Sequence, residues 1–225
     1  MTLLLASQSP RRKSLLSTLG IPFEVLPPPK GVDMELLEAP RDREQPLAYV
    51  KRVTRAKLSV MRQLCAPSDT VLVADTTVTM DGLILGKPLS ALENERMLRL
   101  LSGRTHRVMT AVAIGCGTFG LVQVGLGVKA CSAQTLNSEP TLKPCNTDSF
   151  NLITSKVTFA PLTEQQITHY IKTQEGFDKA GGYAIQGLAA PFVRHISGDY
   201  SAIVGLPLHA TATLLAERGF HAAAS

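Results

Sequence analysis

Short apolar runs alternate along this 225-residue chain with segments in which apolar residues recur at helical spacing. Capping residues precede several of the periodic segments, and turn residues bound the apolar runs. The pattern predicts helices at residues 10–19, 46–64, 90–101, 163–172 and 207–219. It predicts strands at residues 3–6, 23–26, 70–74, 78–80, 83–85, 107–114, 121–131, 152–159 and 188–196. Because this order mixes strands with helices, we expect an α/β fold with a mixed sheet.

Turn and capping residues set several of these bounds. Asp81-Gly82 between two apolar runs is typical of a tight hairpin. Ser90 with Glu93, and Thr163 with Gln166, match the capping-box pattern at a helix start. Two segments lack periodicity and are expected to form loops. These are residues 27–43, read as a mobile loop, and residues 132–149, read as a surface insertion.

The composition is that of a globular domain, and its mild positive charge is explained best by a solvated surface, although it also fits an anionic ligand. Hydrophobic residues make up 44% of the chain, which suffices for one domain, or two small lobes, with a packed core. The formal net charge is +5, and an anionic ligand fits this charge. The lysines and arginines are dispersed, so no stable nucleic-acid partner is expected.

The cysteines and the longest uncharged stretch bear on location. The four cysteines show no C-x-x-C pair and no histidine at zinc spacing, so we read them as free thiols of a cytoplasmic protein. A Cys131–Cys145 pair stays open. Residues 108–128 carry no charge and are long enough to span a bilayer. Five glycines there favour instead two strands turning at residues 116–120, so no membrane partner is expected.

Two arginines at the start of the first predicted helix conflict with local rules. Arg11 and Arg12 lie one turn before Leu15 and Leu16, on the same apolar face of the helix. They also lie in the first turn, where the helix dipole disfavours cations. An anion at the free N–H groups of the helix start would resolve both conflicts. Alternatively, both side chains reach solvent at the helix edge. The preceding segment Ser7–Pro10 favours a phosphate site.

Lys57 and Asp75 are charges where packing favours apolar residues. Lys57 follows Val50 by seven residues and precedes Val60 by three, so it lies in the apolar stripe of its helix. It either contacts phosphate or carboxylate groups in a cleft or reaches solvent. Asp75 follows an apolar run, at what we take as the carboxyl end of a strand, where α/β sheets bind ligands. It either serves a divalent cation or a base role, or makes a local turn bond.

Two further segments carry candidate ligand contacts. Lys87 between Gly86 and Pro88 suits a fixed phosphate contact or an ordinary turn. Residues 178–187 contain glycines that let backbone approach a ligand closely. Within this segment Lys179 can contact phosphate, and Gln186 can both donate to and accept from a base edge. Without further context, a plain glycine-rich connection explains the segment better.

Six segments, in one order, resemble the Maf family of nucleotide pyrophosphatases. They are Leu5–Arg12, Ala74–Thr76, Leu85–Pro88, Leu101–His106, Asp178–Gly181 and Val204–Pro207. Each is weak alone, whereas six in order are specific. The resemblance implies that residues 1–225 form one Maf-like domain, with two lobes around a deep cleft. It also implies an elongated mixed β-sheet with flanking helices, similar to the inosine-triphosphate pyrophosphatases.

The resemblance further implies an activity and its residues. Members hydrolyse a nucleoside triphosphate between the α and β phosphates with Mg²⁺ or Mn²⁺, often as homodimers. Asp75 matches the catalytic, metal-binding aspartate. Positions around the triphosphate are matched by Ser7, Arg11, Arg12, Lys57, Lys87 and Lys179. Positions tied to base choice are matched by Arg11, Thr76 and Gln186, and Ile185-Gln186-Gly187 looks like the dTTP/UTP branch.

Alternatives remain within and outside the enzyme class. The sibling branch acting on 7-methyl-GTP usually has a glutamate at the position of Gln186, and other modified nucleotides are conceivable substrates. The family has also been linked to septum formation, so a non-enzymatic regulator that binds nucleotide or nucleic acid is the second alternative. A regulator need not keep Asp75 together with Lys57 and Lys87, so their joint presence favours the enzyme.

The chain departs from the family pattern at two short motifs and in the loop at residues 132–149, which is longer than usual in the family. The family often has Val-Asp-Glu after the second strand, but here Met34 follows Val32-Asp33. If that glutamate binds metal, Asp33 or Glu35 must replace it, and Glu35 is our candidate. Near the end, Ala202 stands where family members commonly have asparagine.

Overall fold

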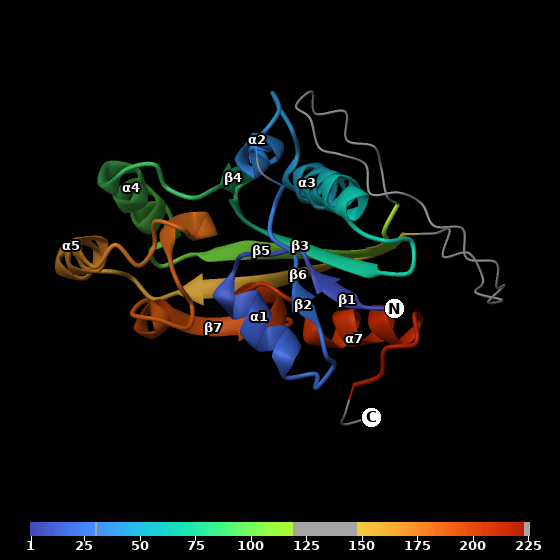
Figure 1. The fold of residues 1–225 in the computed structure, drawn as a ribbon. Helices are drawn as coiled ribbons and strands as arrows, with labels where there is room; N and C mark the ends of the chain where they lie inside the picture. Colours follow the sequence, from blue (N-terminus) through green and yellow to red (C-terminus); the bar gives the residue numbers. More distant parts are fainter. Residues whose placement is uncertain (30, 119–147, 223–225) are drawn as a thin grey trace, which may run out of the picture.

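One mixed sheet with helices on both faces forms the molecule (Figure 1). The structure is a computed structural model and describes residues 1–29, 31–118 and 148–222. Helices α2 and α3 lie above the sheet in this view, α1 and α7 lie below it, and α4 and α5 cover one end. This arrangement confirms the predicted mixed α/β fold.

The sheet combines a short parallel part with a long antiparallel part. Its described strands are β1 (Leu3–Leu5), β2 (Glu24–Val25), β3 (Thr70–Met80), β4 (Leu83–Leu85), β5 (Thr105–Cys116), β6 (Ser149–Phe159) and β7 (Val193–Ser197). They are ordered β2-β1-β3-β5-β6-β7, and β4 pairs with β3 at the side. β1 runs parallel to β2 and β3, whereas all other pairs are antiparallel. β3 therefore spans both parts of the sheet.

The helices begin largely where the capping residues predicted. They are α1 (Pro10–Ser17), α2 (Met34–Glu38), α3 (Pro46–Met61), α4 (Ala91–Leu101), α5 (Glu164–Lys172), α6 (Tyr200–Val204) and α7 (Leu208–Ala216), with 3-10 turns η1 (Arg62–Leu64), η2 (Ala180–Gly182) and η3 (Ala190–Phe192). Thr163 and Gln166 form the predicted capping box. The Ser90 side chain accepts from the Glu93 N–H, whereas the Glu93 carboxylate accepts from the Leu89 N–H.

Asp75 does not end a strand, contrary to expectation. β3 pairs with β5 from Thr70 to Thr79, so it continues five residues past Asp75, to Met80. Only the parallel pairing with β1 stops early, at Leu72. The antiparallel partner is distant in sequence, and no local signal near Asp75 reveals it. Asp75 thus lies mid-strand, just beyond the end of β1.

Other predicted elements also need correction. Residues 27–43, expected to be a loop, contain the helix α2. Residues 188–192 are not strand, because Pro191 lies in η3 and β7 begins only at Val193. The expected end of the insertion at residue 149 is also wrong, because Ser149 already belongs to β6. The expected strand 121–131 and residues 132–147 lie outside the described residues.

The described residues also bear on the cysteines and on the uncharged stretch. No described helix is long and apolar enough to cross a membrane. The described part of the stretch, up to residue 116, belongs to β5. Cys65 is free and buried, whereas Cys116 is disulfide-bonded. The prediction of four free thiols is therefore wrong at Cys116.

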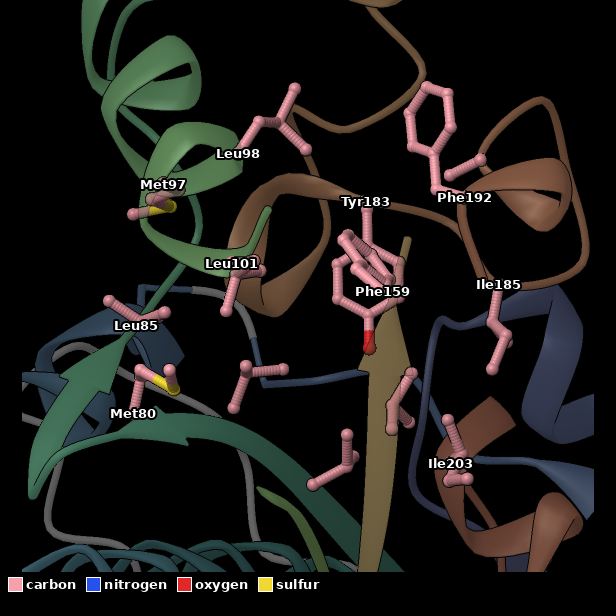
Figure 2. Packing of buried hydrophobic residues seen from close by; sticks show 14 of the residues in the cluster. Met80, Leu85, Met97, Leu98, Leu101, Phe159, Tyr183, Ile185, Phe192 and Ile203 are labelled. Carbon is pink, nitrogen blue, oxygen red and sulfur yellow. The ribbon is translucent and has the colours of Figure 1, made fainter. Parts of the chain in front are cut away.

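The largest apolar cluster packs α4 and α5 against the far end of the sheet. Figure 2 shows Tyr183 and Phe159 at its centre, between Leu101 of α4 and Ile185. The Phe159 and Tyr183 rings meet edge to face, with centroids 4.8 Å apart. His106 meets both rings in the same manner, at 5.1 and 5.4 Å. This cluster anchors the segment that follows α5.

His106 is a titratable group inside this apolar cluster. Its ring is 1% exposed, and Nε2 lies 2.7 Å from the Tyr183 hydroxyl oxygen. Nδ1 has no hydrogen-bond partner among the described residues. Burial disfavours the charged imidazolium and lowers the pKa of His106 to about 4. The folded protein therefore keeps His106 neutral.

This neutral histidine predicts a pH-dependent stability. Below about pH 6.5 the unfolded chain binds a proton at this histidine that the folded protein binds only near its lower pKa. The free energy of unfolding should therefore decrease as the pH is lowered from about 6.5 to about 4. The variant His106→Gln should lack this component. Urea unfolding at a series of pH values measures it. Equal pH dependence in the two proteins would contradict the burial of a neutral His106.

Candidate active site

A cleft of about 570 Å³ opens where β1 ends beside β3. Its walls come from the start of α1, from α2 and α3, from β3 and the β4 end, and from residues 178–185 and 203–205. Nine predicted site residues line it: Ser7, Arg11, Arg12, Glu35, Lys57, Asp75, Thr76, Lys87 and Lys179. A hollow of about 790 Å³ beside α5 is larger but contains none of them. The smaller cleft is therefore the candidate site.

The floor of the cleft is a lysine shared by two carboxylates. Lys57 Nζ lies 2.5 Å from Asp75 Oδ1 and 2.7 Å from Glu38 Oε1. The side chains of Lys57, Asp75 and Glu38 are 12%, 9% and 27% exposed, respectively. Burying a charge is costly unless it is paired, and this arrangement pairs all three. Asp75 and Glu38 thus face each other across one ammonium group.

Packing of α3 on the sheet places Lys57. Val50 and Val53 are fully buried on the face of α3 that covers the sheet. Lys57 follows Val50 by two helical turns and so points to the same side. At that height the sheet presents Asp75 rather than an apolar residue. Lys57 therefore lies in the lining of the cleft, with Asp75 as the partner for its charge.

Glu38 was not predicted, yet it lies closer to the lysines of the cleft than Glu35 does. Glu35 is 81% exposed, and its carboxylate lies 3.7 Å from Lys87 Nζ. Glu38 contacts both Lys57 and Lys87, the latter at 3.4 Å. Met34 also lines the cleft and lies one helical turn before Glu38 on α2. Asp33 instead caps the helix by accepting from the Glu35 N–H.

The lysines keep Glu38 ionised. Burial alone would raise the pKa of Glu38, but the charges and hydrogen bonds of Lys57 and Lys87 outweigh it. The pKa of Glu38 therefore lies below its ordinary value. The two lysines therefore favour the charged form of Glu38 at the cleft floor.

Arg12 forms the second wall and is fixed by backbone and hydroxyl groups. Its Nε donates to the Gly205 carbonyl at 2.8 Å, and Nη2 donates to Thr76 Oγ1 at 3.2 Å. Thr76 Oγ1 lies 3.0 Å from Thr110 Oγ1, which in turn lies 2.6 Å from the Ala202 carbonyl oxygen. Burial lowers the pKa of Arg12, and the charge of Asp75 opposes this shift. Thr76 thus orients a cation toward the cleft floor.

The start of α1 offers N–H groups and a second arginine. The Ser9 side chain caps the helix by accepting from the Arg12 N–H, and Ser7 Oγ accepts from the Ser9 N–H at 3.2 Å. No acidic residue occupies the first turn. Burial lowers the pKa of Arg11, opposed by the negative charges of Asp178 and Glu175. This corner suits an anion.

Lys87 and Lys179 share the opposite rim. The Gly181 N–H donates to the Gly86 carbonyl at 3.0 Å, which ties the 178–182 segment to the end of β4. Gly181 has φ +75°, a backbone conformation that favours glycine. Lys87 is 44% exposed, and Lys179 pairs with Asp178. The two lysines can therefore reach a ligand from the same side.

Gln186 is the one predicted site residue that does not line the cleft. Its side chain is exposed, whereas its neighbour Ile185 lines the cleft and is 8% exposed. Gln186 lies in a turn after Ile185, where successive side chains point in different directions. The structure therefore leaves Arg11 and Thr76 as the predicted base-choice residues inside the cleft.

The arrangement suits a polyanion and a divalent cation. The described residues contain no group of three or more histidine, cysteine or acidic side chains that could hold a metal. Mg²⁺, however, is usually bound by one or two carboxylates together with substrate phosphates and water. Asp75 and Glu38 are hard oxygen donors on either side of the Lys57 ammonium, so their chemistry fits the two carboxylates of such a site.

Known proteins are similar to this chain over almost its whole length. The model of the Maf-like protein family matches residues 2–218. A dTTP/UTP pyrophosphatase from Polaromonas sp. (strain JS666) is 45% identical over 220 residues, covering 96% of this chain and 95% of that protein. A dTTP/UTP pyrophosphatase from Burkholderia pseudomallei is 45% identical over 215 residues, covering 94% and 90%. Relatives this similar share the family of the chain.

A search of solved structures adds a weaker likeness. The chain is similar to a nucleoside-triphosphatase / dITP/XTP pyrophosphatase from Mycobacterium abscessus, with 12% identity and a TM-score of 0.37, covering 72% of this chain and 76% of that one. A likeness this weak supports no statement about the site. The family match and the relatives confirm the resemblance drawn from the six motifs: the chain belongs to the Maf-like protein family.

Proposed function

We propose that this chain hydrolyses dTTP and UTP to the nucleoside monophosphate and pyrophosphate. The names of its relatives support this substrate pair. The observation that carries the proposal is the paired floor of the cleft, where Lys57 joins Asp75 and Glu38 beneath a ring of further cations. Hydrolysis of a phosphoanhydride depends mainly on such charge neutralisation and positioning.

The cations bind the triphosphate. Lys57 reaches it from the floor, and Arg12 reaches it from the α1 wall. Lys87 and Lys179 reach it from the rim. Ser7 and Arg11 contact it at the start of α1. Lys57 and Lys87 exchange one anionic partner for another when phosphate arrives, so they need not be desolvated anew. This exchange favours a polyanionic ligand.

Asp75 is the base that directs water to the α phosphorus. It is 7% exposed, and one oxygen is held by Lys57, which fixes the direction of the carboxylate. A fixed carboxylate beside the bound triphosphate can orient a water and accept its proton. Mg²⁺ or Mn²⁺, held by Asp75 and Glu38, would supply neutralisation of the charge on the phosphate oxygens.

We assign base choice to Arg11 and Thr76. Both line the cleft and can present hydrogen-bonding groups to a base. Gln186 contributes only if the base extends to the rim, because its side chain is exposed in the structure. We also propose that residues 1–225 act as one Maf-like domain in a cytoplasmic homodimer without a nucleic-acid partner.

A nucleotide panel tests the substrate proposal. Pyrophosphate release with Mg²⁺ or Mn²⁺ should be selective for dTTP and UTP over CTP, GTP, ATP, ITP and 7-methyl-GTP, because relatives named for those two substrates are 45% identical to this chain. Release from 7-methyl-GTP alone would replace the substrate with that of the sibling branch. No release from any nucleotide would contradict the enzymatic function.

Asp75→Asn should abolish turnover without unfolding the protein. The amide cannot accept a proton, and loss of a general base costs about 100-fold or more in kcat. The control is Asp81→Asn, in the β3–β4 hairpin outside the cleft, where asparagine tolerates the local φ of 51°. Steady-state kinetics and thermal melts compare both with the natural chain. Turnover close to that of the natural chain in Asp75→Asn would contradict the assignment.

Lys87→Ala should weaken both binding and the chemical step. The lysine pairs with Glu38 and is partly exposed, so its loss should raise KM and lower kcat, about 10- to 100-fold together in kcat/KM. Lys13→Ala, an exposed lysine of α1 that does not line the cleft, is the matched control. Unchanged kinetics in Lys87→Ala would remove Lys87 from the site.

A further inference from the structure

The helix that carries Glu38 has little apolar packing to hold it in place, since among its residues only Met34 packs, partly buried, against an apolar cluster. α2 has five residues, none of them buried, and Leu36 is 72% exposed. A single helical turn is marginal in water without tertiary packing. Its last carbonyls also have no partners within the helix. Some other interaction must therefore hold Glu38 at the cleft floor.

Arg52 of α3 supplies that interaction. Its Nη1 donates to the Leu37 carbonyl at 3.0 Å, and its Nη2 donates to the Ala39 carbonyl at 2.9 Å. The Tyr49 hydroxyl, also on α3, donates to the Glu38 carbonyl at 2.7 Å. Three consecutive carbonyls at the end of α2 thus accept from one face of α3.

Glu44 holds the guanidinium of Arg52 in this orientation. Its carboxylate accepts from Nε and Nη2 of Arg52, both at 2.7 Å, in a bidentate pair. It also accepts from the Arg41 N–H, which closes the loop after α2. The hydrogen bond from Arg52 lowers the pKa of Glu44 to about 2. The pair is therefore ionised throughout the neutral range.

The same helix carries the partner of Glu38. Lys57 lies five residues after Arg52 on α3, and α3 is anchored on the sheet by buried residues. Arg52 fixes the backbone on both sides of Glu38, and Lys57 receives its side chain at 2.7 Å. One rigid element therefore sets both ends of this ion pair.

We propose that Arg52, oriented by Glu44, is a positioning residue for the reaction, because it holds the last turn of α2 so that the Glu38 carboxylate meets Lys57 and Lys87. Neither Arg52 nor Glu44 lines the cleft, so neither touches the substrate. The inference rests on the proposed function, which uses Glu38 as the second carboxylate. It does not depend on which nucleotide is the substrate.

The role requires arginine rather than any cation. Arg52 uses Nε, Nη1 and Nη2 toward three acceptor groups that lie in different directions. A lysine ammonium is a single point and cannot span them. Arg52→Lys should therefore keep the charge but lower kcat nearly as much as Arg52→Met does.

A double-mutant cycle with Glu38 tests the role of Arg52. Arg52→Met should lower kcat about 10- to 100-fold, as is typical when the support of a site residue is lost, with a smaller change in KM. In a Glu38→Gln background the same substitution should change kcat less than about twofold, because the group that Arg52 positions is already lost. An equal loss in both backgrounds, or no loss in the natural chain, would overturn the proposal.

Thermal melts and a matched control separate positioning from stability. Arg52→Met should lower Tm equally in both backgrounds, although its effect on kcat differs between them. Arg55→Met is the control, because Arg55 also lies on α3 but contacts the Phe150 ring, which belongs to β6. It should leave kcat unchanged. A loss of kcat in Arg55→Met as large as that in Arg52→Met would contradict a specific role of Arg52.

Hydrogen exchange tests the clamp, that is, the hold of Arg52 on the carbonyls of Leu37 and Ala39, without an activity measurement. Amides of residues 36–39 should exchange about 10-fold faster or more in Arg52→Met and Arg52→Lys, whereas those of β3 should not change. If the natural chain releases no pyrophosphate but this acceleration occurs, the proposed function fails and the clamp on α2 stands. Unchanged exchange at residues 36–39 would overturn the clamp itself, whatever the activity.

Discussion

The ammonium group of Lys57 holds two carboxylates together at the floor of the cleft, and the rest of the site is arranged around that contact. Removing one member of a buried, mutually paired set leaves an uncompensated charge, which is far more costly than the set is stabilising. Asp75 is placed by a strand, Glu38 by a one-turn helix and Lys57 by a long helix. The three elements must therefore pack correctly at the same time for any of the three charges to be tolerated.

The surrounding cations follow from the same constraint. Arg12 is held by the Gly205 carbonyl and by Thr76, and Lys87 approaches Glu38 from the rim. Without ligand, carboxylates and backbone carbonyls satisfy these cations. In the function that we propose, a triphosphate offers stronger acceptors in the same places, so binding exchanges partners within a site that is already oriented. Such preorganisation is what a reaction that depends on charge neutralisation requires.

Local patterns predicted the parts of the site that break local rules. Arg12 and Lys57 stood out because a charge on an apolar helix face needs a partner, and the structure supplies one for each. Asp75 was found from its place after an apolar run, but its strand continues because β5, far away in sequence, pairs with it. The mixed sheet was predictable because strand and helix periods differ clearly along the chain.

Other parts were invisible to sequence reasoning for physical reasons. Glu38 lies on a helix of five residues, too short to show periodicity, and it is held by a distant arginine rather than by its own packing. Gln186 lies in a turn, where side-chain direction depends on backbone dihedrals that composition does not encode. Glu38 nevertheless places a second carboxylate at the cleft floor, one helical turn after Met34, which departs from the family pattern.

The central claim is that water, directed by Asp75, attacks the α phosphorus of the bound triphosphate. Hydrolysis of dTTP in H₂¹⁸O, followed by mass spectrometry of both products, tests it most directly. The account predicts that one ¹⁸O atom enters the nucleoside monophosphate and none enters pyrophosphate. Label in pyrophosphate would place the attack on the β phosphorus and contradict the account.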